Sequence, residues 1–281
     1  MIFLIKLELK RVFINKKMVN ILILAFIITV CSSFCYLKDY IFFNYNAPDL
    51  QSAELQESAK KMVHSALNKY DVWLSSLNWY ICMMPVISAL PCALTYREDI
   101  ESNMISNIDC RIKHSKYISS KIITNAISGG IIVTIPIIIS FIISNIFFGG
   151  TLEDFSTTKG FGGSFNSVFI NNYYKYILIH LGIEFLCGFS YSTIALAVSS
   201  KVKNSMAIIL SPFLYWAGGS VIISFFNLPI NVPTDINQFY MCEKLTLSEI
   251  LVHLAFIFVA ASATFIYYTR KDDIYEKRDI I

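Results

Sequence analysis

Six long apolar runs, separated by polar segments, dominate the sequence. The runs cover residues 18–37, 76–96, 122–148, 174–199, 205–226 and 250–268. Each is close to the ~20 residues that an α-helix needs to cross the hydrocarbon core of a bilayer. Aromatic residues such as Tyr40, Trp73 and Tyr268 stand near their ends, where aromatic belts lie in membrane proteins. The pattern predicts an all-α membrane protein with six transmembrane helices spread over residues 18–269.

Two other segments have the pattern of amphipathic helices. In residues 1–17, apolar side chains such as Ile2, Leu9 and Val12 share one helical face, and the basic residues lie off it. This predicts an N-terminal helix that lies along the membrane surface. Residues 49–71 repeat the pattern between the first two spans, and Asp49 is a plausible N-cap. We expect this second helix on the outer side of the membrane.

The remaining connections differ from one another in composition. Residues 149–172 are rich in glycine, which is typical of a flexible loop. Residues 227–248 contain two prolines and predict either a re-entrant or an interfacial segment. Residues 97–121 are strongly polar, with a group of acids followed by a group of bases, so they must project into water. Met104, Ile105 and Ile108 between the two groups predict a short amphipathic helix suited to a groove on a partner.

Composition supports the membrane class and excludes others. Hydrophobic residues make up 55% of the chain and charged residues 15%, with a mean hydropathy of +0.56. A net charge of +3 gives no reason to expect a nucleic-acid partner. The seven cysteines are mostly inside apolar runs and form no C-x-x-C pair. This argues against a disulfide framework and against a zinc site.

The distribution of lysine and arginine predicts the orientation in the membrane. Of the 23 basic residues, sixteen fall in residues 1–17, the loop 97–121, the turn 200–204 and the tail 270–281. The positive-inside rule therefore places both termini and the loop 97–121 in the cytoplasm. We expect a multi-pass protein of the plasma membrane, of bacterial origin, with lipids around its spans.

The sequence has the spans of a transporter but no phosphate-binding loop. No G-x-x-x-x-G-K-[ST] motif occurs, and the glycines near residues 149–163 lack the Lys-Ser/Thr pair that would follow. If transport uses ATP, another subunit must bind it.

These features together resemble the ABC-2 type permease family of ATP-driven exporters. The shared features are a surface amphipathic helix, six spans, both ends inside, and a charged helical loop between spans two and three. The family's loop often begins with Glu-x-x-x-Gly-Thr, continues with a small residue and Arg, and ends at a Lys that opens the third span. The matching positions here are Glu98, Ser102-Asn103, Cys110-Arg111 and Lys121, while Gly-Thr is missing.

The resemblance implies that the loop is a coupling helix that docks on a separate ABC ATPase subunit, which binds the ATP. It also implies a second six-span permease, as a homodimer or a paralogue, and export of a peptide, drug-like or hydrophobic compound. The chain itself would then be no enzyme and would hold no catalytic residue, cofactor or metal. The expected coupling residues are Arg97, Glu98, Asp99, Glu101, Ile105, Arg111, Lys113 and Lys121.

One acid, Glu184, lies well inside an apolar run, and His180 is one helical turn before it. A carboxylate at that depth costs roughly 2.5–3.5 kcal/mol, so we expect both to face protein or a watery cavity. They either join two helices or line the cargo path. An ion- or proton-driven carrier and an intramembrane enzyme remain alternatives to the exporter, although the four histidines are scattered and no repeat is visible.

Overall fold

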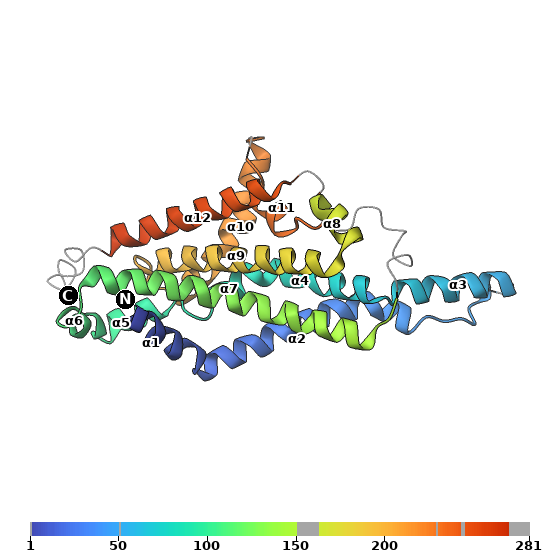
Figure 1. Cartoon of the computed structure of the whole chain (residues 1–281), viewed down its shortest axis with the longest axis horizontal. Helices are drawn as coiled ribbons and strands as arrows, with labels where there is room; N and C mark the ends of the chain where they lie inside the picture. Colours follow the sequence, from blue (N-terminus) through green and yellow to red (C-terminus); the bar gives the residue numbers. More distant parts are fainter. Residues whose placement is uncertain (1, 51, 151–162, 229, 243–244, 270–281) are drawn as a thin grey trace.

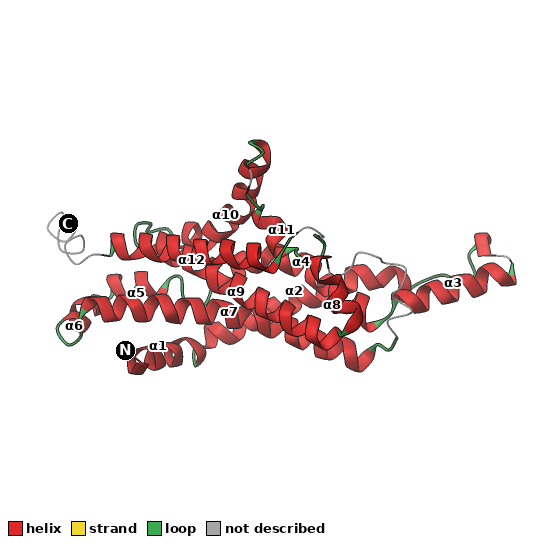
Figure 2. Cartoon of the chain, turned by 45° about the horizontal axis from the view of Figure 1, so that its top comes forward, coloured by secondary structure: helices red, strands yellow, loops and turns green. Residues whose placement is uncertain are grey.

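The structure, a computed structural model, describes residues 2–50, 52–150, 163–228, 230–242 and 245–269. Over these residues the chain forms helices and no strand (Figure 2). Six of the helices are long and apolar enough to cross a membrane. They are α2 (Lys16–Ile41), α4 (Lys69–Ala89), α7 (His114–Phe147), α9 (Tyr173–Ser199), α10 (Ser205–Phe225) and α12 (Leu247–Tyr268). The chain is therefore an all-α, multi-pass membrane protein, as the apolar runs predict.

Two of the six spans begin much earlier than the hydropathy pattern predicts, at Lys69 in place of residue 76 and at His114 in place of residue 122. The second starts at Lys69, because the Asn68 side chain accepts hydrogen bonds from the two backbone N–H groups of Tyr70 and Asp71. It ends at Ala89, two residues before Pro91, which has no backbone N–H with which to continue the helical hydrogen bonds. The third span starts at His114, so the residues just before 122 belong to the helix and not to the loop.

Six short helices complete the described chain. They are α1 (Ile2–Phe13), α3 (Ala53–Ala66), α5 (Thr95–Glu101), α6 (Met104–Asp109), α8 (Asn166–Asn171) and α11 (Pro233–Asn237). The helix predicted for 49–71 is shorter, because Ser52 and not Asp49 is its N-cap and Asn68 already caps α4. Residues 163–171 of the predicted glycine-rich loop are helical, as a 3-10 turn followed by α8. Residues 151–162 and the tail 270–281 lie outside the described residues.

The long helices α2, α4, α7, α9 and α12 run along the long axis of the molecule (Figure 1). Helices α1, α5 and α6 lie at one end, which we call the polar end, and α3 lies at the other. The central pair is α7 and α9, which approach closely at Gly129 and Gly188. A Cβ atom added at Gly188 would lie 2.6 Å from the carbonyl oxygen of Gly129. The two helices can therefore pack at this distance only through small residues, as membrane helices commonly do.

The connection between α10 and α12 folds back against the middle of α9. The Tyr191 hydroxyl donates a 2.8 Å hydrogen bond to the Asn237 side chain, and the Phe239 ring lies 4.9 Å from the His180 ring. Ile236, Asn237 and Phe239 are fully buried. Because His180 and Tyr191 lie in the interior of a candidate span, these contacts favour a re-entrant segment over an interfacial one.

Candidate functional site

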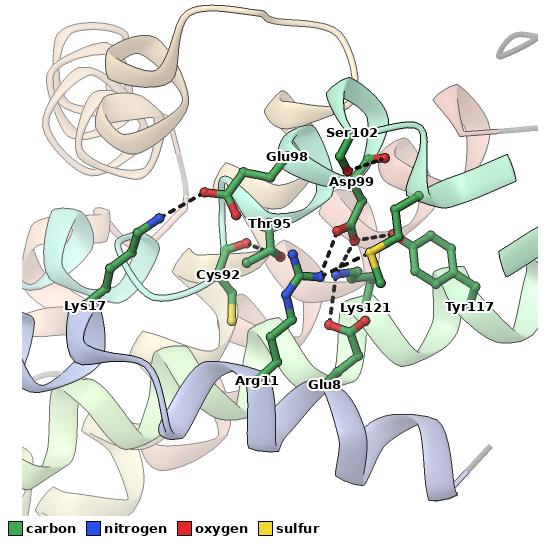
Figure 3. A network of polar contacts seen from close by, with 11 residues as sticks. Glu8, Arg11, Lys17, Cys92, Thr95, Glu98, Asp99, Ser102, Tyr117 and Lys121 are labelled. Carbon is green, nitrogen blue, oxygen red and sulfur yellow. Dashed lines mark hydrogen bonds and ion pairs between the residues drawn. The ribbon is translucent and has the colours of Figure 1, made fainter. Parts of the chain in front are cut away.

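Three charged side chains from three different helices meet at the polar end of the bundle (Figure 3). The ammonium group of Lys121 on α7 lies 2.9 Å from the Glu8 carboxylate on α1 and 2.6 Å from the Asp99 carboxylate on α5. All three side chains are buried, with exposed fractions of 2%, 7% and 0%. We call this cluster, together with Arg11 and Tyr117, the buried ion network.

Arg11 and Tyr117 complete the network around Asp99. The Arg11 guanidinium donates a 2.8 Å hydrogen bond to Oδ1 of Asp99, and the Tyr117 hydroxyl donates one of 2.6 Å to Oδ2. The Asp99 carboxylate thus has partners on both α1 and α7, and the two acids balance the two bases. Such pairing is what makes burial of charge tolerable, because an unpaired charge in this place would lose its hydration without compensation.

The network also shifts the pKa of two of its members, Asp99 and Arg11. Burial alone would raise the pKa of Asp99, but the Lys121 charge and three hydrogen-bond donors outweigh it and lower the pKa. Burial disfavours the charged form of Arg11, and the Asp99 carboxylate more than offsets this and raises the pKa. A lowered pKa means that Asp99 stabilises the fold at neutral pH. This contribution disappears as the pH falls through the lowered value.

The residues predicted for the coupling loop separate into an inner and an outer set. Asp99, Ile105 and Lys121 are buried, so in this conformation they hold the loop to the bundle and do not face outward. The outer set is half-exposed or exposed and consists of Arg97, Glu98, Glu101, Arg111 and Lys113.

Two ion pairs involve the outer set, one within α5 and one between α5 and α2. Arg97 pairs with Glu101 at 2.9 Å within α5, and Glu98 pairs with Lys17 of α2 at 3.1 Å. Exposed pairs of this kind contribute little to stability, about 0–1 kcal/mol. Their side chains can therefore exchange partners at small cost.

An apolar cluster packs α5 and α6 against the ends of the spans. Ile105 of α6 is buried with Tyr96 of α5, Tyr117 of α7 and Phe265 of α12. The rings of Tyr96 and Phe265 are 4.8 Å apart in an edge-to-face arrangement. Helices α5 and α6 are therefore packed on the ends of two spans as well as being tied to them by charge.

Three members of the network, Glu8, Arg11 and Tyr117, were not among the site residues predicted from the sequence. A signal for Glu8 is present, since it is an acid in an otherwise basic segment and shares a helical face with Val12. Glu8 and Val12 are both buried in the structure. Tyr117 has no such signal, because a tyrosine at the start of a span is common at membrane interfaces.

The intramembrane pair predicted on α9 faces protein. His180 and Glu184 are both fully buried, and Nε2 of His180 lies 3.8 Å from Oε1 of Glu184. On the opposite side Leu178 is 71% exposed, as expected for a lipid-facing residue. Leu196, farther along the same helix, is buried in the cluster at the polar end.

Comparisons with protein-family models, with curated proteins and with solved structures find no match to this chain. Within the described ranges, no group of three His, Cys, Asp or Glu side chains is placed to hold a metal ion. The functional argument therefore depends on the geometry of the bundle and on the two charged sites described above.

Proposed function

We propose that the chain is the permease subunit of an ATP-driven ABC exporter, and that ATP is bound and hydrolysed by a separate nucleotide-binding subunit. The observation that supports this most is the pair of helices α5 and α6 at the polar end, where Asp99 joins α5 to the buried ion network and Ile105 packs α6 into the apolar cluster. A connection that only joined two spans would need no such attachment.

The network supplies a path from the loop to the membrane helices. A partner that pushes on α5 moves Asp99, and Asp99 is bound to Arg11 on α1 and to Lys121 on α7. Helix α7 in turn packs along α9 in the centre of the bundle. Motion at the loop would therefore reach the interior through rigid helices. Coupling to a separate ATPase subunit requires such a connection.

The outer side of α5, α6 and the turn that follows α6 is the proposed docking surface. It carries acidic Glu98 and Glu101, apolar Met104 and basic Arg111, all of them exposed. An apolar residue with charges of both signs around it suits a groove on another protein. A second six-span permease, identical or paralogous, and a peptide, drug-like or hydrophobic cargo complete the proposal.

The direct test is purification of the full chain in mild detergent from its native membrane. We expect a nucleotide-binding protein to co-purify, and ATP hydrolysis to appear in the complex and not in the chain alone. ATP hydrolysis by the purified chain without a second protein would overturn the proposal.

The orientation is part of the proposal, because the ATPase must meet the polar end in the cytoplasm. Ser115 is exposed at the start of α7, beside the network. In intact cells we expect a cysteine placed at Ser115 to stay unlabelled by a membrane-impermeant maleimide, and to react after the membrane is opened. A cysteine placed at Ser52, at the other end, should react in intact cells. Labelling of position 115 from outside would reverse the topology.

A proton-driven carrier is the second candidate, because the bundle interior holds an ionisable pair, His180 and Glu184. The proton chemistry of that pair does not depend on ATP coupling.

A further inference from the structure

Glu184 has an environment in which a carboxylate is unstable. Its side chain is fully buried, and neither oxygen has a hydrogen-bond partner in the structure. The nearest ionisable nitrogen, Nε2 of His180, is 3.8 Å away, beyond the ~2.7–3.2 Å of an N–H···O hydrogen bond. A buried carboxylate needs donors or a paired charge, and Glu184 has neither at bonding distance. The packed state is therefore consistent with a protonated, uncharged Glu184.

His180 is enclosed by aromatic rings, and it can carry a proton there only as part of an ion pair with Glu184. Its ring is surrounded by four aromatic rings at centroid distances of 4.9 to 5.9 Å. These belong to Trp73 on α4, Tyr176 on α9, and Phe239 and Tyr240 on the re-entrant segment. Burial among these rings disfavours an imidazolium that stands alone, so a charged His180 would be stabilised mainly by the carboxylate with which it pairs. Both ring nitrogens of His180 are without a hydrogen-bond partner, so one is available to accept a proton.

The other ionisable groups near Glu184 are phenols and thiols. They come from α4, α9 and the re-entrant segment, and they are Tyr80, Tyr176, Cys187, Tyr191 and Tyr240. Phenols and thiols have ordinary pKa values of about 8.5–10, so they are uncharged at neutral pH. The other buried charged side chains of the described residues are Glu8, Asp99 and Lys121, which pair with one another at the polar end. The pair on α9 must therefore balance its own charge.

We propose that His180 and Glu184 form a proton-transfer pair in the bundle interior, in which Glu184 holds the proton and His180 is its acceptor. In the transfer the O–H bond of the carboxyl breaks and an N–H bond forms on the imidazole. The uncharged pair becomes an ion pair, so the net charge of the site stays zero. Movement of one side chain by less than an ångström would close the gap from 3.8 Å to bonding distance.

The re-entrant segment forms part of the surroundings of His180, so its position affects the proton site. Phe239 and Tyr240 supply two of the four rings around His180. If the segment moved away, the site would admit water, and hydration would stabilise a charged His180. The proton could then leave through His180. This inference does not depend on an ATPase partner, and it holds for an exporter or a carrier alike.

Infrared spectroscopy of the full chain in lipid nanodiscs tests where the proton is. At neutral pH we expect the C=O stretch of a protonated carboxyl in the wild-type protein and its loss in Glu184→Gln. The matched control is Glu54→Gln, an exposed acid on α3, which should leave the band unchanged. Absence of the band in the wild type, or its survival in Glu184→Gln, would show that Glu184 does not hold the proton.

Hydrogen–deuterium exchange of the same band tests the role of His180. In His180→Gln we expect the band to remain, because Glu184 is unchanged, but its shift in D₂O to slow by at least about tenfold, since the acceptor is lost. A residue that only packed would not affect this rate. Equal exchange rates in the wild type and in folded His180→Gln would overturn the transfer role, whatever the outcome of the ATPase experiments.

Discussion

Replacing Lys121 by methionine is expected to lower the free energy of unfolding by about 3–5 kcal/mol. The change keeps most of the side-chain volume but removes the ammonium group between Glu8 and Asp99. Asp99 would keep Arg11 and Tyr117, whereas Glu8 would remain buried without a positive partner at bonding distance. Helix α1 should therefore separate from α7 before the rest of the bundle unfolds.

Unfolding in mixed detergent micelles measures the effect. Lys116→Met is the matched control, because Lys116 is an exposed lysine on the same helix and its loss should change stability by less than about 0.5 kcal/mol. Adding Glu8→Gln to Lys121→Met should recover part of the loss, since it removes the orphaned charge. If Lys121→Met proves as stable as Lys116→Met, the buried ion network does not hold the polar end together.

The double variant Met104→Asp, Arg111→Glu is expected to weaken binding of the ATPase partner by about tenfold to a hundredfold. Residues at the centre of a docking surface commonly contribute 1–3 kcal/mol each, and a buried or reversed charge adds repulsion. Both side chains are exposed, so the bundle itself should fold normally. Co-purification and stimulated ATPase activity in nanodiscs give the measurement.

The matched control for the docking surface is Lys116→Glu, a charge reversal on an exposed residue at the same end but outside α5 and α6. It should leave partner binding within about twofold of the wild type. Unchanged binding in the double variant, with the partner identified, would move the docking surface away from α6. A loss in both variants would indicate a general electrostatic attraction and not a defined contact.

The six spans could be predicted from the sequence, because a run of about 20 apolar residues rarely forms a structure other than a membrane helix. It was a poorer guide to where helices begin. The start of α4 at Lys69 depends on the Asn68 cap, and α7 continues through Lys121, a charged residue that hydropathy assigns to the loop. Local hydrogen bonding and long-range pairing decided these boundaries, and neither is visible in hydropathy.

The inner members of the candidate site were the hardest to predict. Lys121 is paired with Glu8, which is 113 positions away in the chain, and with Asp99 on a different helix. A charged residue in a polar loop ordinarily faces water, so only the tertiary structure reveals that these two are buried. The pair His180 and Glu184 could be found because it is local, one turn apart on one helix.

Photocrosslinking from position 104 is the measurement that tests ATP coupling through a separate subunit most directly. A photoreactive phenylalanine analogue would replace Met104, which is 36% exposed on α6, and in a matched protein Met62, which is 58% exposed on α3 at the opposite end. In native membranes we predict a crosslink from position 104 to a nucleotide-binding protein, and no such crosslink from position 62. Absence of a nucleotide-binding protein from the products at position 104, in a folded and active complex, would contradict the proposed function.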